Sequence, residues 1–537
     1  MKTKSFIKNT VAIILLSVVA QCTSDLKQLN IDPTSSSLTS IDPNYLLTNC
    51  QVTYTGSADF SYETWRAQLI HFSTMMQHFS HVAGYWVGDK YLNNPTYQAA
   101  YFQCAYGGDG GDLGQIKNIV PLVEVTKGNP NHSNLYQIAR IWKVVEFHRI
   151  TDIYGDVPYF QAGHGFDQGI LAPKYDSQQD IYMDMLNELD EAATALDPLK
   201  DVPYGDLIYN GDAAKWKKFA YSMMLRLATR LSKVDAATSK TWIEKAATGG
   251  TFTSIADNAI VVADPAQGRP TINRISQILN LSYEMPNVRW SKTFIDYLAN
   301  NNDPRLSVLA ELPPAPPNNA TPGLAGDNTF ANQQGMPNGY DEGGGATDIT
   351  NEPNYPGANG SDVLGYYSRP NNILLANPGG PTFIITYAET ELMLAEAAEL
   401  GYSVTGSAAT HYNNGVTAAM AQLSQFNATL GAIPPASITV YLTAHPYVAG
   451  ATGIQMINTQ YWAATIFNDY ETFANWRRSG WPALVPVNYP GNVTGGTIPR
   501  RLIYPQTEAL LNTTNYNSAV AKITGGDQMT SRVWWDQ

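Results

Sequence analysis

The chain has 537 residues, of which 44% are hydrophobic, 15% charged and 11% aromatic, and its formal net charge is −13. This composition excludes an intrinsically disordered protein, because such chains have too little apolar surface to offset the entropy lost on folding. The acidic balance argues against nucleic acid as a partner, since phosphate contacts need a basic stripe of a kind that the sequence lacks. The 32 Tyr, 42 Gly and 32 Pro instead indicate a folded protein whose long loops carry polar and aromatic surface.

The amino terminus is similar to a bacterial lipoprotein signal. Three lysines precede the apolar run 11–20, which is too short to span a bilayer. Cys22 follows this run, and the sequence VAQC is similar to a lipobox, although Gln21 replaces the usual small residue. We therefore expect residues 1–21 to be a signal peptide, Cys22 to be lipidated and residues 22–40 to form a flexible tether. Ordinary cleavage nearby is the alternative.

Apolar residues at spacings of three and four predict several amphipathic helices. The clearest spans 216–231, with Asp212 as its N-cap. A second is predicted over 381–400, where small residues would allow close approach of a neighbouring helix and Gly401 ends the helix. Looser stripes predict further helices at 61–82, 135–153, 178–196, 405–424 and 456–478. Strand signals are few and short.

Residues 310–381 differ in composition from the helical segments. They contain PPAPPNNATPG, NQQGMPNGYDEGGGATD, NYPGANGSD and NPGGP, and a loop region of this length is usually functional or mobile. Shorter stretches at 83–97, 280–290 and 365–372 combine Tyr and Trp with Asn and turn residues. An aromatic ring face suits the apolar face of a sugar ring or a peptide side chain. The candidate ligand-binding residues are Tyr85, Trp86, Tyr91, Tyr283, Trp290, Tyr366 and Tyr367, and for each of them packing in the interior is the competing interpretation.

Seven segments carry a family resemblance in the correct order. They are the lipobox with TSDLKQLNIDP, then TDIYGDVPYFQA, GDAAKWKKFAYSMMLRLATRLS, DPRL, TYAETELMLAEAAELGY, YETFANWRRSGWPAL and IPRRLIYPQTEALLNTTNY. Together they resemble the SusD/RagB family of nutrient-binding surface lipoproteins of the Bacteroidota, and more closely its SusD-like subgroup 2. The resemblance implies a mainly α-helical fold of tetratricopeptide-like helix pairs. It implies that residues 41–537 form one such domain, with 310–381 as a loop-rich, irregular, ligand-facing insertion.

The resemblance also implies a location and a partner. Anchoring through Cys22 would hold the protein on the outer membrane, where a SusC-like TonB-dependent barrel transporter would be its partner. The sequence TSD after Cys22 is similar to the acidic signal that sends such lipoproteins to the cell surface, although it has a single acid rather than two.

Two groups of residues have both a metal-binding and a structural interpretation. His71, His78 and His81 fall within one arc of a predicted helix. No carboxylate or cysteine completes a recognisable ligand set, which favours a helix seam or surface. Asp109 and Asp112 in GGDGGDLG lack the order of an EF-hand, which favours a loop with Asp112 as a helix N-cap.

Paired arginines and cysteines are also open to two interpretations. A planar guanidinium suits a carboxylate ligand, but the family resemblance favours internal fasteners for Arg477/Arg478 and Arg500/Arg501. Cys50 and Cys104 could form a disulfide in an oxidising envelope, although two scattered cysteines are weak evidence for one.

The stretch TDIYGDVPY contains Asp152 and Asp156, which could be mistaken for a catalytic pair. We interpret them instead as local hydrogen-bond acceptors that shape a turn. Gly155 would end the preceding helix with a left-handed residue, and Pro158 would prevent its continuation.

The sequence contains no H-E-x-x-H, G-x-S-x-G, P-loop or paired C-x-x-C pattern, so we expect neither an enzyme nor a bound metal or cofactor. A glycosidase carboxylate pair cannot be recognised from sequence and stays open. The leading hypothesis is a lipoprotein that captures an oligomeric nutrient, a glycan rather than a peptide, and delivers it to the barrel. The alternative is a structural accessory that docks in an outer-membrane assembly and binds no nutrient.

Overall fold

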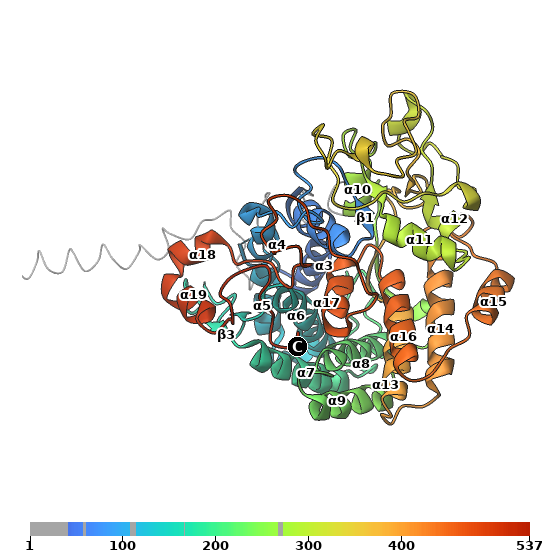
Figure 1. The fold of residues 1–537 in the computed structure, drawn as a ribbon. Coiled ribbons are helices and arrows are strands. Elements are labelled where there is room, and N and C mark those ends of the chain that lie inside the picture. The colour runs from blue at the N-terminus through green and yellow to red at the C-terminus, as the bar shows by residue number, and fades with distance from the viewer. Residues whose placement is uncertain (1–40, 57–60, 108–113, 166, 267–271) are drawn as a thin grey trace, which may run out of the picture.

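The computed structural model describes residues 41–56, 61–107, 114–165, 167–266 and 272–537. The predicted signal peptide, Cys22, the tether, Asp109 and Asp112 lie outside these ranges. Helices make up about 49% of the chain and the strands are few and short, which confirms a mainly α fold of the tetratricopeptide-like type. Figure 1 shows the loop-rich segment between α12 and α13, coloured yellow, at one end of the helical body.

Helices from the two ends of the chain form this body. The first half contains α3 (Pro43–Tyr54), the π-helix η1 (Ser61–Ser73), α4 (Pro95–Gly107), α5 (Gln115–Thr126), α6 (Ser133–Tyr154), α7 (Gln178–Ala195), α8 (Ala213–Arg230) and α9 (Ala236–Gly249). The short helices α10 (Arg274–Leu279), α11 (Lys292–Asn300) and α12 (Leu306–Leu309) follow. The second half contains α13 (Tyr387–Glu399), α14 (Ala408–Ala421), α15 (Pro435–Ala444), α16 (Ala451–Ala464), α17 (Asp469–Ser479), α18 (Gln506–Leu511) and α19 (Thr513–Val520). Consecutive helices pack as pairs, including α6 with α7, α8 with α9 and α13 with α14.

Local sequence explains where the best-defined helices begin. The Asp212 side chain accepts hydrogen bonds from the backbone N–H groups of Ala214 (2.9 Å) and Lys215 (3.1 Å), which confirms it as the N-cap of α8. At α13, Thr386 and Glu389 form a reciprocal capping box. Gly401 follows α13 with φ +75°, a conformation that glycine adopts without strain.

Eight short strands form four antiparallel pairs in the described part of the chain. The pairs are β1 (Phe79–Ser80) with β5 (Arg289–Trp290), β2 (Val157–Pro158) with β3 (Tyr175–Asp176), β4 (Ala259–Val262) with β8 (Pro381–Ile385), and β6 (Ala310–Glu311) with β7 (Arg369–Pro370). The last pair places the two ends of the loop-rich segment side by side.

Three of the predicted helices are wrong in extent. Residues 381–385 form strand β8, because this stretch of aromatic and β-branched residues pairs with β4 and the capping box starts the helix only afterwards. The helix predicted over 61–82 ends at Ser73, and Gln77 adopts φ +55°. The helix predicted over 456–478 is two helices, α16 and α17, separated by a turn in which Phe467 has φ +65°.

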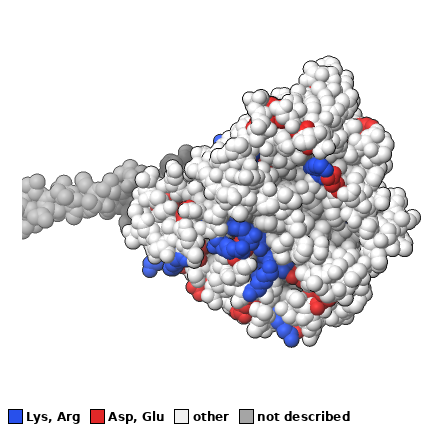
Figure 2. Space-filling model, in the orientation of Figure 1, with Lys and Arg blue, Asp and Glu red and all other residues white. Residues whose placement is uncertain are grey.

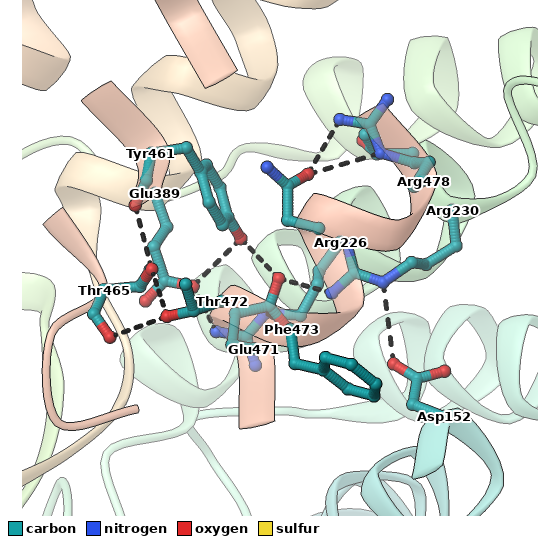
Figure 3. A network of polar contacts seen from close by, with 12 residues as sticks. Asp152, Arg226, Arg230, Glu389, Tyr461, Thr465, Glu471, Thr472, Phe473 and Arg478 are labelled. Carbon is teal, nitrogen blue, oxygen red and sulfur yellow. Dashed lines mark hydrogen bonds and ion pairs between the residues drawn. The ribbon is translucent and has the colours of Figure 1, made fainter. Parts of the chain in front are cut away.

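A network of buried charges joins α6, α8, α13, α16 and α17 (Figure 3). Arg226 bonds Glu389 at 2.6 Å, and Arg230 bonds both Glu471 and, at 3.5 Å, Asp152. Burial alone would raise the pKa of Glu471, but Arg230 and Arg226 hold that pKa at about 2. Removing one member of such a network leaves an uncompensated buried charge, so these residues fix how the helices pack.

Asp152 and Asp156 are not the local turn acceptors that we predicted. Asp152 accepts from Tyr182 of α7 and from Trp535 Nε1 (3.1 Å). Asp156 accepts the backbone N–H of Gln178 at the start of α7 (2.9 Å). Both carboxylates therefore join distant elements, because the turn brings them against other helices. Gly155 does end α6, with φ +86°.

Cys50 on α3 and Cys104 on α4 are both buried, and the disulfide that we left open is not formed. Within the described ranges, no helix combines the length and apolar character needed to cross a membrane.

Candidate functional site

Three partly exposed aromatic rings meet between η1, the turn after β1 and the turn before β5. The Trp65 ring centroid lies 5.9 Å from that of Tyr85 and 5.9 Å from that of Tyr283. Tyr283 is 49% exposed, while Trp65 and Tyr85 are partly buried against the core. We call Trp65, Tyr85 and Tyr283 the aromatic platform. Its ring faces can pack on the apolar face of a ligand.

A buried carboxylate holds one ring of the platform in place. Glu284 accepts hydrogen bonds from the Tyr85 hydroxyl (2.7 Å), Trp86 Nε1 (3.1 Å) and His81 Nε2 (3.0 Å). The His81 and Trp86 rings are stacked, with centroids 4.3 Å apart. Three donors thus satisfy a carboxylate that water does not reach, so the orientation of Tyr85 is set before any ligand arrives.

His81 takes part in this arrangement as a neutral ring. Its Nδ1 accepts the backbone N–H of Ala83 (3.0 Å), so the proton is on Nε2, which donates to Glu284. Burial lowers the pKa of His81, although the Glu284 carboxylate opposes that shift. Burial, followed by Glu284, raises the pKa of the Tyr85 hydroxyl, which therefore stays protonated as a donor.

The turn that carries Tyr85 is fastened to the loop-rich segment. Lys90 donates to the backbone oxygens of His81 (2.9 Å) and Trp86 (3.0 Å), which closes the turn on itself. Asn338 donates to the side chain of Asp89 (3.1 Å) and to the backbone oxygen of Phe79 (2.8 Å). The platform therefore lies where the helical body meets the long loops.

Of the seven residues predicted to bind ligand, only Tyr85 and Tyr283 are brought together. Tyr366 is 42% exposed, but its ring is not one of those that meet Trp65. The other four, Trp86, Tyr91, Trp290 and Tyr367, are buried. In this structure they offer no ring face to a ligand, so the packing interpretation holds for them.

Each of these buried rings has an interior partner. Trp290 Nε1 donates to the backbone oxygen of Leu309 (3.0 Å). The Tyr91 hydroxyl accepts the backbone N–H of Val487 (3.2 Å). Tyr367 belongs to a small cluster with Val82 beneath the long loops. Loop-like flanking sequence predicted exposure for these rings, but the loops fold over them.

Trp65 and Glu284 were not among the predicted site residues. Trp65 falls in a stretch whose pattern predicts a helix, whereas the predicted ligand contacts all lie in turn-rich stretches. The π-helix η1 that carries Trp65 is a rare form, frequently found at functional sites. Nothing in the sequence pairs Glu284 with Tyr85, because their contact arises only from folding.

The three histidines do not converge on one point. His71 Nδ1 bonds the backbone oxygen of Arg66 (2.7 Å), His78 bonds Asp469 (2.6 Å) and His81 bonds Glu284. No group of three potential metal ligands occurs in the described part of the chain. These contacts favour the structural interpretation. The other metal candidate, the 107–114 loop, leads to α5, whose N-cap is Gly114 rather than Asp112.

The two arginine pairs bind the protein itself. Arg478 bonds Glu396 through two hydrogen bonds of 2.5 and 2.7 Å. Arg501 bonds Asp527 (2.7 Å) and the backbone oxygen of Tyr154 (2.8 Å). Arg477 donates to the backbone oxygens of Asp152 and Arg500, and Arg500 bonds Asp536. All four act as internal fasteners of the carboxy-terminal half.

Two large cavities lie away from the aromatic platform. A cavity of about 640 Å³ adjoins the start of α7 and the last residues of the chain. Another of about 590 Å³ lies among α4, α5 and α18. Neither is lined by the platform, which is a surface feature rather than an enclosed pocket. A surface of this kind suits one stretch of a long molecule better than a small molecule that must be enclosed.

Most of the surface seen in Figure 2 is neither acidic nor basic. Lys and Arg form one connected band near the carboxyl terminus, and separate smaller patches lie elsewhere on that face.

Comparison with known proteins identifies relatives of this fold. A search of curated proteins found no match. Among solved structures, a chitin-binding protein is 34% identical, with a TM-score of 0.78, and the match covers 92% of this chain and 100% of that protein. A Bacteroidetes SusD-like protein, AC2a, is 24% identical, with a TM-score of 0.78 and coverage of 93% and 100%. A SusD homolog from Bacteroides uniformis is 23% identical, with a TM-score of 0.72 and coverage of 92% and 99%.

A family model described as starch-binding and associating with the outer membrane matches residues 35–505. Proteins of this family are outer-membrane-associated glycan-binding proteins of nutrient uptake, and they bind rather than catalyse. The matched residues include every member of the platform and the network around Glu284. The predicted resemblance is confirmed, and the chain belongs to the SusD-like family.

Proposed function

We propose that this protein is a surface lipoprotein that captures an oligosaccharide on the aromatic platform and delivers it to a SusC-like TonB-dependent barrel. The observation that carries the proposal is the meeting of Trp65, Tyr85 and Tyr283, with Tyr85 oriented by Glu284. Rings that are already oriented lose little freedom when a sugar packs on them, so more of the contact energy appears as affinity.

Chitin oligosaccharides are the first ligands to test. The 34% identical relative is described as chitin-binding. A chitin chain presents apolar ring faces for the platform and acetamide groups that need hydrogen-bond partners. Asn287 Nδ2 donates to the backbone oxygen of Tyr283 (2.7 Å), so one amide side chain lies beside the platform, and its oxygen is the group that could accept from an acetamide N–H.

Calorimetry on the purified protein tests the ligand. We expect saturable binding of chitin oligosaccharides, with affinity that rises from two sugar units to about six as more rings gain a contact. Starch-derived oligosaccharides and peptides of similar length serve as comparisons. Binding of a peptide but of no oligosaccharide would contradict the proposal, and hydrolysis of the oligosaccharide would show a glycosidase instead.

Delivery needs a separate experiment in cells. Deleting this gene while the partner barrel is still expressed should abolish or strongly slow uptake of the ligand found by calorimetry. Purification from membranes should yield one TonB-dependent barrel as the partner. A larger envelope assembly, together with no affinity for any oligomer, would instead support the accessory role.

A further inference from the structure

An exposed apolar surface surrounds the point where the described chain begins. It is formed by the first turn of α3 and the loop between α7 and α8. We call it the tether-exit face, and its members, with their exposed fractions, are Tyr45 (63%), Leu199 (90%), Val202 (67%), Tyr204 (53%) and Leu207 (37%). Apolar residues this exposed, gathered at one place, usually mark an interaction surface.

The face is built rigidly. The Tyr45 and Tyr204 rings meet edge to face, with centroids 6.0 Å apart, and the Tyr204 hydroxyl donates to Asp42. Thr48 of α3 donates to the backbone oxygen of Gly205 (2.7 Å). The backbone N–H of Leu207 donates to Gln51 Oε1 (2.7 Å). The loop is therefore held on α3, and its apolar side chains point outward from a fixed base.

The acidic groups around the face are engaged with the protein. Asp201 accepts the backbone N–H groups of Asn134 (2.8 Å) and Leu135 (3.2 Å) at the start of α6. Asp206 is buried and accepts Trp216 Nε1 (2.7 Å). Lys200, between Leu199 and Val202 in the loop, is exposed. The face thus combines tyrosines and aliphatic side chains with one cation, Lys200, and one carboxylate, Asp42, that the Tyr204 hydroxyl holds, a composition that suits a bilayer interface.

The length of the chain that precedes the face brings it close to a membrane. Cys22 and Ile41 are separated by 19 residues along the sequence. A chain of that length spans at most roughly 65 Å when fully extended. A surface at the end of such a chain meets the bilayer at a high effective concentration, so even a weak affinity is enough to orient the protein.

We propose that the tether-exit face rests on the lipid surface and so fixes the orientation of the protein relative to the membrane. This inference depends on the lipid anchor at Cys22 that forms part of the proposed function. The tyrosine rings lie at the level of the headgroups, with the Tyr204 hydroxyl held by Asp42, and Leu199 and Val202 reach toward the acyl chains.

An environment-sensitive dye on the full lipidated protein tests this. The protein is reconstituted in vesicles of phosphatidylethanolamine and phosphatidylglycerol that contain a spin-labelled phosphatidylcholine as quencher. The dye is attached at Val202→Cys or, as matched control, at Val440→Cys, because Val440 on α15 is also a valine and is 70% exposed. Cys50 and Cys104 are buried and do not compete for the dye.

We expect the emission at position 202 to shift to shorter wavelength and to be quenched, whereas the emission at position 440 stays unshifted and unquenched. Leu199→Cys provides a second probe in case Val202→Cys perturbs the loop. Equal behaviour at 199, 202 and 440 would overturn the inference. A shift of the emission at 202 to shorter wavelength without quenching, seen only when the partner barrel is in the same vesicle, would also overturn the inference. It would assign the face to the barrel.

The mass of Cys22 is measured on the same preparations. A protein without acyl chains would show that the proposed anchor has failed. An acylated protein with no quenching at 199 or 202 would show that the anchor holds and that this inference has failed.

Discussion

The Tyr85 hydroxyl donates a 2.7 Å hydrogen bond to Oε1 of Glu284, a residue 199 positions further along the chain. The contact joins the turn after β1 to the turn before β5, and it sets the direction of one ring of the platform. Because the carboxylate is buried and has two further donors, Tyr85 cannot turn away without leaving an acceptor unsatisfied. The platform is therefore organised in the absence of ligand.

Replacing Tyr85 with Phe should weaken both stability and binding. The ring remains, but the loss of one buried hydrogen bond should lower the free energy of unfolding by about 1 kcal/mol. The freed ring must then be ordered on binding, so the affinity for chitin oligosaccharides should fall by roughly threefold to tenfold. Urea unfolding and calorimetry measure the two effects.

Tyr45→Phe is the matched control, because Tyr45 is 63% exposed and lies on the tether-exit face. This substitution should leave unfolding and oligosaccharide affinity of the soluble protein unchanged. Unaltered affinity in Tyr85→Phe would show that Glu284 does not orient the ring for binding.

Replacing Tyr283 with Ala should remove a ring face from the platform. Its ring is half exposed and meets only partly buried neighbours, so the loss of stability should stay below about 1 kcal/mol. The affinity should fall about tenfold, which corresponds to a stacking contribution of about 1.4 kcal/mol. Tyr366→Ala is the comparison, since Tyr366 is exposed to a similar degree but lies outside the platform. A larger loss with Tyr366→Ala would move the site to the 365–372 loop.

Replacing Trp290 with Phe should lower stability but leave oligosaccharide affinity unchanged, which is the opposite of what we expect for Tyr283→Ala. The indole is fully buried and donates to the backbone oxygen of Leu309, which would lose its partner. We expect the free energy of unfolding to fall by about 1–3 kcal/mol, with oligosaccharide affinity unchanged at a temperature where the variant is folded. A large loss of affinity in a stable Trp290→Phe protein would restore Trp290 as a binding residue.

Replacing Glu396 with Gln should change how stability depends on pH. Burial alone would raise the pKa of Glu396, but the Arg478 guanidinium and Asn458 hold that pKa below its ordinary value. A carboxyl whose pKa is lowered by folding contributes its full stabilisation above its unfolded pKa, about 4.3, and loses it as the pH falls through the folded value. The free energy of unfolding of wild type should therefore exceed that of Glu396→Gln most at pH 7, and the difference should narrow below about pH 4.

Urea unfolding at pH 7, 5, 4 and 3 measures this gap. Glu124→Gln on α5 is the control, because Glu124 is exposed, and it should follow wild type at every pH. A gap that stays constant down to pH 3 would contradict the role assigned to the ion pair with Arg478.

Replacing Cys22 with Ser should release the protein from membranes. Without the acyl chains, the tether-exit face alone should bind too weakly to survive washing, since even a single acyl chain gives only marginal binding. Labelled palmitate and fractionation of washed membranes measure the effect. Wild-type levels of membrane-bound protein in the Cys22→Ser variant would contradict lipid anchoring.

Sequence patterns were most informative where neighbouring residues decide whether a segment is a helix or a strand. The Asp212 cap and the following apolar stripe predicted α8 closely, because both signals lie within a few residues of each other. Residues 381–385 were misassigned because their partner strand is more than a hundred residues away. A periodic stripe contains no information about such a pairing, so tertiary contact overrode the local preference.

The platform illustrates the same limit. Neighbouring Asn and turn residues pointed to Tyr85 and Tyr283, which reach the surface, but equally to Trp86 and Trp290, which the chain buries. Glu284 was not among the predicted site residues, because nothing in its local sequence sets it apart from other acidic residues. Its importance comes from three donors that arrive from the 81–86 turn, and such a convergence exists only in three dimensions.

The pairing of β6 with β7 bears on how proteins of this kind can change their ligands. Ala310 pairs with Pro370 and Glu311 with Arg369, so the long loop segment leaves and rejoins the helical body at neighbouring points. Doubling the length of such a closed loop costs only about 0.6 kcal/mol in closure entropy. Insertions in this segment therefore cost the scaffold little stability, provided that the contacts of Asn338 with Phe79 and Asp89 are kept.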